Sequence, residues 1–251
     1  MNTNSIGILV FVCVFGATLV GILLHAVLPK NHLSTDSKEV IKVAIGLVAT
    51  MTALLLGLLI ASAKGSYDSQ QNRVVQMAAK VAILDRALVK CGPDSDAARE
   101  QLRGNVAHVI GRIWPADRST LTQLDPVAAE GDKLYATINR ILPQNDEQQA
   151  AKIMALKIAT DIGELYSELF AKAGTTIPTP LLVVVVCWLV IIFLSFGLFT
   201  PPNGTVIAAL LAAALSVSTA LHMIIELDRA FGGVIQVSSE PMRTALDHLA
   251  R

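Results

Sequence analysis

Residues 43–63 constrain the fold of this chain more than any other stretch. The segment contains no charged residue and is long enough, as a helix, to cross a hydrocarbon core about 30 Å thick. Three more apolar runs, at 6–28, 180–200 and 205–227, are of similar length. Backbone polar groups in lipid must be satisfied within the segment, which favours helices. The sequence therefore predicts a polytopic membrane protein with four transmembrane helices.

Composition agrees with this prediction and excludes several classes of protein. Hydrophobic residues make up 53% of the 251 positions, and a mean hydropathy of +0.57 is too high for an ordinary soluble domain. Twenty basic and twenty acidic residues cancel, so no net field draws the chain to nucleic acid. Cys13, Cys91 and Cys187 are scattered, which fits neither a disulfide framework nor a zinc site.

The four apolar runs divide the chain into two transmembrane hairpins around a helical middle. The first hairpin spans 1–65, with a polar turn at 29–41 and an N-terminal run that we expect to be a retained helix. That run lacks the basic start and the cleavage site of a signal peptide. The second hairpin spans 178–228 and turns at 201–204. A helical domain at 66–177 lies between them, and a short segment follows at 229–251.

Helical signals fill the middle of the chain. Val75, Ala79, Ala82 and Val89 recur at helical spacing, and neither proline nor glycine occurs from 66 to 91. The second membrane helix is therefore expected to continue outward until Gly92-Pro93.

Three further helices are expected before the second hairpin. One begins near Asp94 and stops before Pro115, and another opens at Asp125-Pro126 and closes at Pro143. A capping box formed by Asn145 and Gln148 opens the last one. No run alternates with period two, so the prediction is an all-α fold.

A row of small residues marks one face of the second membrane helix: Ala49, Ala53, Gly57, Ala61 and Gly65. Four-residue spacing places them on one side, where another helix can approach closely. Two interpretations stay open: an ordinary packing seam, or the central helix of an oligomer beside a pore with Thr50, Thr52 or Ser62 as polar lining. The fourth membrane helix has a similar row at Ala208, Ala212, Ser216 and Ala220, which predicts that the second and fourth helices pack together.

A polar cluster ends the fourth membrane helix. Thr219, His222 and Glu226 share one face, and Asp228 and Arg229 follow. Charged groups this close to lipid usually face protein or water. The cluster is interpreted as a structural exit from the membrane, with Glu226 paired to Arg229, or alternatively as the lining of an aqueous path.

The sequence carries no motif of a known catalytic or cofactor site. It lacks a phosphate-binding glycine loop, an HExxH zinc motif, a nucleophile elbow and a nucleotide fingerprint. We therefore expect no enzyme activity, no metal and no cofactor.

Three segments resemble the bacterial bestrophin-like domain family of integral membrane proteins: LGLLIASAKGSYD at 56–68, FLSFGLFTPPNG at 193–204 and IELDRAFGGVIQVSSEPMR at 225–243. One departure is Ala230, where the family pattern leads us to expect a proline. The resemblance implies no established biochemical function for the family. It implies the same order of elements as in bestrophins, which are pentameric anion channels; this step is an analogy between folds.

Two functions are compatible with these features of the sequence. The first is an oligomeric ion channel, although the second helix lacks the aromatic constriction of bestrophins and no acidic cluster suggests a calcium site. The second is a non-transporting scaffold or sensor whose helical domain binds a partner. In both, lipid is the expected surrounding and the bacterial inner membrane the expected location. Basic residues near the membrane ends are weakly biased toward the side that carries the termini and the helical middle. This bias, strengthened by the resemblance, predicts that this side is the cytoplasm.

Overall fold

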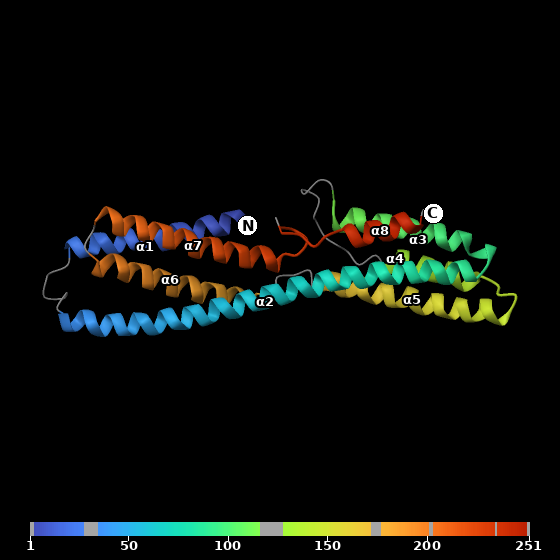
Figure 1. Cartoon of the computed structure of the whole chain (residues 1–251), viewed down its shortest axis with the longest axis horizontal. Coiled ribbons are helices and arrows are strands. Elements are labelled where there is room, and N and C mark those ends of the chain that lie inside the picture. Colours follow the sequence, from blue (N-terminus) through green and yellow to red (C-terminus); the bar gives the residue numbers. More distant parts are fainter. Residues whose placement is uncertain are drawn as a thin grey trace. The chain divides into compact units, whose positions relative to one another are not determined.

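The computed structural model describes residues 3–27, 35–115, 128–171, 177–200, 203–233 and 235–249. Within these ranges every regular element is a helix, so the predicted all-α fold is confirmed. The helices are α1 (Thr3–Val27), α2 (Thr35–Lys90), the 3₁₀ turn η2 (Pro93–Ser95), α3 (Asp96–Ile113), α4 (Ala128–Arg140), α5 (Asp146–Ala171), α6 (Thr179–Phe199), α7 (Gly204–Asp228) and α8 (Glu240–Leu249) (Figure 1).

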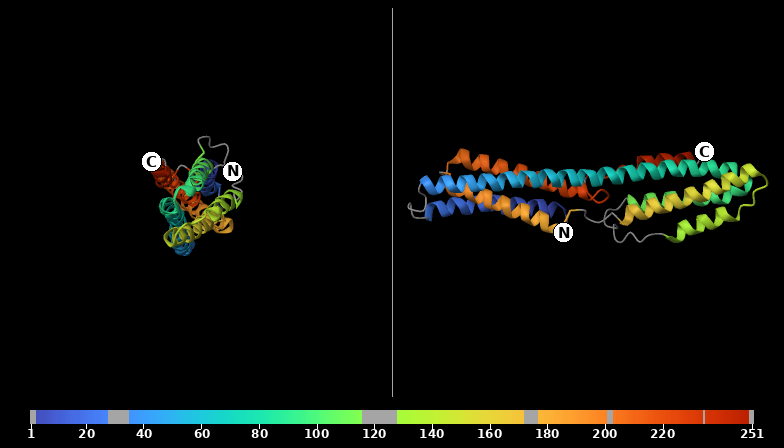
Figure 2. Two further views of the ribbon diagram at one scale, coloured as in Figure 1. Left: turned by 90° about the vertical axis from the view of Figure 1, so that its right-hand side faces the viewer. Right: turned by 90° about the horizontal axis from the view of Figure 1, so that it is seen from below.

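The chain forms two compact units. Unit 1 comprises Met1–Ser66 and Thr175–Asp228, and unit 2 comprises Tyr67–Gly174 and Arg229–Arg251. The helix α2 contributes to both, and it is seen as one uninterrupted helix in Figure 1 and in the right-hand view of Figure 2. It ends before Gly92, whose φ of +90° is a conformation that favours glycine. The expected continuation of the second membrane helix as a long rod is therefore confirmed.

Unit 1 holds the apolar helices. Four segments are long and apolar enough to cross a membrane: Ser5–Val27, Glu39–Lys90, Thr179–Phe199 and Gly204–Asp228. The protein is therefore a membrane protein, as the sequence predicts. Helix α1 packs against both α6 and α7, and side chains of all four helices build one core, including Val14, Leu59, Val185 and Leu221.

The two turns predicted between the apolar helices are only partly described. Of the predicted polar turn at 29–41, residues 29–34 lie outside the described residues. Residues 35–41 are helical, which corrects the prediction. This segment has no proline or glycine that would end a helix. Pro201 and Pro202 also lie outside the described residues, whereas Asn203 caps α7 by accepting a hydrogen bond from Val206 N at 3.2 Å.

The tightest packing in unit 1 joins α1 and α6 at two glycines. A Cβ added at Gly21 would collide with the backbone oxygen of Leu194, and one at Gly197 would collide with that of Thr18. Nearby, His25 Nδ1 donates to Leu198 O at 2.6 Å. The sequence prediction placed close packing on other helices and missed this crossing.

Unit 2 is a helical bundle with its own core. The outer half of α2 supplies Val74, Met77, Val81, Leu84 and Leu88 to it. The helix predicted from the spacing of Val75, Ala79, Ala82 and Val89 is present. Val75 and Val89 themselves are 47% and 54% exposed, and the buried face is the one that carries Met77, Leu84 and Leu88.

The capping box at the start of α5 is confirmed in its main bond. Asn145 Oδ1 accepts a hydrogen bond from Gln148 N at 2.8 Å. The return bond differs, because Gln148 Oε1 accepts from Gln144 N rather than from the cap residue itself. The predicted opening of α4 at Asp125-Pro126 lies outside the described residues.

The C-terminal segment belongs to unit 2. Trp114 Nε1 donates to Val237 O at 2.8 Å, and Val237 N donates to Ala230 O at the same distance. Trp114 also meets the ring of Phe231 edge-on. Ala230 is buried, so the residue that departs from the family pattern sits inside a hydrogen-bonded turn.

Candidate functional site

The small-residue row of α2 lies on an exposed face of the single chain. Ala53, Gly57, Ala61 and Gly65 are exposed, and only Ala49 packs partly against the core of unit 1. A Cβ added at Gly57 or Gly65 would meet no atom within 4 Å in the part of the chain that the structure describes. Within one chain, therefore, this row is not a packing seam.

The opposite side of α2 makes the contacts with unit 1. Thr52, Leu59 and Ala63 are buried. At 3.6 residues per turn, these three positions share one stripe, and Thr50, Gly57 and Ala61 lie on the other side of the helix. The membrane part of α2 thus has one face used inside the chain and one small-residue face left outside.

The three residues proposed as polar pore lining differ in their exposure on α2. Thr50 is exposed, next to the small-residue face, and its hydroxyl donates to Gly46 O at 2.9 Å. Thr52 is 3% exposed and donates to Val48 O at 2.7 Å, so its inclusion as pore lining was wrong. Ser62 is exposed.

The small row on α7 is exposed as well. All four of its residues are on the surface of the chain: Ala208, Ala212, Ser216 and Ala220. The second and fourth membrane helices were expected to pack closely through these rows. Both helices contribute side chains to one core, but the two exposed rows do not form that contact. The close approach is made instead by Gly21 of α1 and Gly197 of α6.

The polar cluster of α7 divides into two parts. Thr219 is exposed and His222 is half-buried, whereas Glu226 and Asp228 are 4% and 7% exposed. Asp228 Oδ2 accepts a hydrogen bond from Ile177 N at 3.4 Å. This bond fits the interpretation that the cluster has a structural role where α7 leaves the membrane. Arg229 is half-buried.

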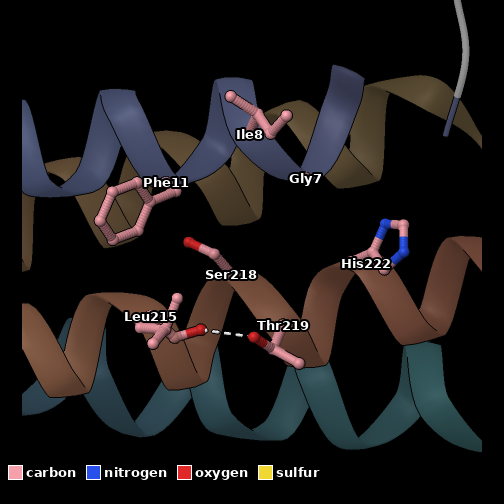
Figure 3. A pocket seen from close by; sticks show the side chains of 7 residues that line it. All are labelled: Gly7, Ile8, Phe11, Leu215, Ser218, Thr219 and His222. Carbon is pink, nitrogen blue, oxygen red and sulfur yellow. Dashed lines mark hydrogen bonds between the residues drawn. The ribbon is translucent and has the colours of Figure 1, made fainter. Parts of the chain in front are cut away.

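Thr219 and His222 line a groove between α7 and α1, seen from close by in Figure 3. The groove has a volume of about 430 Å³, and its other lining residues are Gly7, Ile8, Phe11, Leu215 and Ser218. Thr219 and His222 belong to the polar cluster predicted from sequence, whereas Gly7 and Ser218 do not.

Unit 2 carries ion pairs between its helices. Lys80 Nζ and Asp161 Oδ2 are 2.6 Å apart, and Arg99 pairs with Asp85 at 2.8 Å. The hydrogen bond from Lys80 lowers the pKa of the Asp161 carboxyl. Among the described residues, no three histidine, cysteine or acidic side chains are grouped to hold a metal ion.

Comparison with known proteins places the chain in a family. The family model of the Bestrophin-like domain matches residues 12–242. No curated protein and no solved structure matches the chain. Because the match runs through both sets of apolar helices and the helical middle, the chain belongs to the Bestrophin-like domain family.

Proposed function

We propose that this chain is one subunit of an oligomeric ion channel, with the small-residue face of α2 turned toward the other subunits and the pore. The supporting observation is the exposure of Thr50, Gly57 and Ala61 opposite a buried stripe of the same helix. Small residues give a lipid-facing surface no advantage, whereas they let helices of different subunits approach. A pentamer that carries anions follows by analogy with bestrophins.

The proposed path would be mostly apolar. Thr50 supplies one ring of hydroxyls, with Gly57 and Ala61 on the same broad face. An apolar constriction closes readily by losing its water, and it discriminates weakly between ions of one sign. We therefore propose a pore of low selectivity that opens only when wetted.

Ion flux in reconstituted vesicles tests the proposal. Thr50→Val should lower flux without lowering protein yield, and Gly57→Ser should raise basal leak by wetting the narrow part. Thr52→Val is the matched control, because Thr52 faces the core of the chain and should leave flux unchanged. Purified protein that forms no ring and passes neither anions nor cations would contradict the channel.

The orientation forms part of the same proposal. With four spans, both termini and unit 2 lie on one side, which we propose is the cytoplasm of a bacterial cell with the spans in its inner membrane. Cysteines introduced at exposed positions of α3 or α5, such as Arg103 and Lys157, should resist a membrane-impermeant maleimide in intact cells. Rapid labelling from outside would reverse the topology.

A non-transporting scaffold is the second candidate. It is favoured by a groove of about 550 Å³ between α4 and α5 that carries the acidic side chains of Asp132, Glu164 and Glu168. Oligomeric state in mild detergent discriminates the two, since a monomer is compatible only with the scaffold. Neither role involves an enzymatic reaction.

A further inference from the structure

We propose that the groove between α1 and α7 binds one glycerophospholipid from the surrounding bilayer. Ser218 would donate to an ester carbonyl of the lipid, and His222 would contact its phosphate. This site goes beyond the proposed channel function and does not depend on it.

The hydroxyl of Ser218 differs from its neighbours in having no hydrogen-bond partner among the described residues. Other hydroxyls in these helices donate to the carbonyl one turn earlier, as Ser216 does to Ala212 at 2.9 Å and Thr219 to Leu215 at 2.8 Å. Ser218 is 4% exposed and, in the described part of the chain, its Oγ has no hydrogen-bond partner. A polar group in an apolar surrounding is costly without a partner, so an acceptor from outside the protein is favoured.

The side chain of His222 packs closely against α1 at Gly7. A Cβ added at Gly7 would lie 3.1 Å from Nδ1 of His222, tighter than an ordinary contact. Glycine at this position therefore leaves room for the imidazole, whose Nδ1 also has no partner among the described residues. Ser218 and His222 both project from α7 toward α1 (Figure 3).

Polar and apolar groups follow a definite order along the groove. At 1.5 Å per residue, His222 is about 9 Å and Leu215 about 20 Å from the end of α7 at Asp228. On α1, Gly7 is likewise nearer the helix terminus than Phe11. The polar end of the groove therefore lies nearer the membrane surface, and the apolar end, with Phe11 and Leu215, lies nearer the bilayer centre.

This order matches the order of groups in a glycerophospholipid. A phosphate, then ester carbonyls, then acyl chains follow one another from the surface inward. The volume of about 430 Å³ is within the range of small-molecule sites. A single-chain fatty acid has one polar end only and cannot satisfy two groups one helical turn apart.

Native mass spectrometry of the full-length protein tests the site. The protein would be titrated in detergent with dioleoyl phosphatidylglycerol, dioleoyl phosphatidylethanolamine or oleic acid. Wild type should retain one tightly held phospholipid per chain, and Ser218→Ala and His222→Phe should each weaken retention about fivefold, as expected for one hydrogen bond. Ser216→Ala is the matched control, because its hydroxyl is already paired within α7, and it should retain lipid like wild type.

A second measurement uses the wild-type chain alone, so it does not depend on the folding of a variant. A phospholipid with a photoreactive group in its acyl chain should label peptides that contain Phe11 or Leu215. Equal retention by wild type and both groove variants, labelling spread over other lipid-facing helices, or equally tight binding of oleic acid would each overturn the proposal. Disulfide formation between copies carrying Leu215→Cys would overturn it too, since a second chain would then occupy the groove.

Discussion

Gly21 of α1 and Gly197 of α6 lie at a helix crossing so close that neither position has room for a methyl group. A Cβ at Gly21 would collide with the backbone of α6, and one at Gly197 would collide with the backbone of α1. Close contact of helix backbones in lipid is stabilised by van der Waals packing, which side-chain bulk would remove. This crossing fixes α1 against α6 inside unit 1.

Gly197→Ala should therefore destabilise the membrane unit. The added methyl group forces the two backbones apart, at a typical cost of about 1–3 kcal/mol. Thermal unfolding in detergent, followed by circular dichroism, should show a lower midpoint. Gly16→Ala on α1 is the control, because its Cβ would meet nothing within 4 Å; an equal loss in both variants would contradict the crossing.

The architecture could be predicted from sequence because its signals are local. Long uncharged runs, the Gly92-Pro93 stop and the Asn145 cap each depend on neighbouring residues, and the structure has a helix or a helix end at each. The packing partners could not be predicted in the same way. Small residues occur at Gly21, Gly57 and Gly197 alike, and only the fold decides which of them meets a helix of its own chain.

The same limit applies to the candidate sites. Thr50 and Thr52 were named together as possible pore lining because both are hydroxyls of the second membrane helix, although they lie on different faces in the folded chain. Ser218 carries no sequence signal of its own, because serine in a membrane helix usually bonds to the preceding turn. Its missing partner is visible only when the side chains are placed.

Gly57→Leu should reduce assembly while leaving the fold of the single chain intact. A Cβ at position 57 would meet no atom of the described residues within 4 Å, whereas a leucine side chain would separate helices of neighbouring subunits. Size-exclusion chromatography with light scattering in mild detergent should show a shift toward smaller species. Met51→Ala, at a position 47% exposed and about 120° around the helix from Gly57, should keep the oligomer, and an equal response of both variants would mean that the row has no role in assembly.

The Lys80–Asp161 pair predicts a defined pH dependence for unit 2. The pKa of Asp161 in the folded chain is below its ordinary value of 3.8, so the pair contributes stability above that value. The contribution is lost as the pH falls through the lowered pKa. Asp161→Asn should lower the unfolding midpoint slightly at pH 7, and the difference from wild type should disappear in strong acid.

A variant on the same helix controls for the change in net charge. Glu164 is exposed on α5, and Glu164→Gln should leave the midpoint at pH 7 closer to that of wild type. A difference between Asp161→Asn and wild type that persists or grows in strong acid would contradict the assignment to this ion pair.

The central claim is that copies of the chain meet through the small-residue face of α2, and cysteine cross-linking in membranes tests it most directly. In a background where Cys13, Cys91 and Cys187 are replaced, single cysteines would be placed at Ala53, Gly57 and Ala61, and at Met51 and Leu58 as exposed controls on another side of the helix. Mild oxidation should link copies through the first three positions and not through the two control positions. Links formed only through Met51 or Leu58, or no link from any of the five, would contradict the claim.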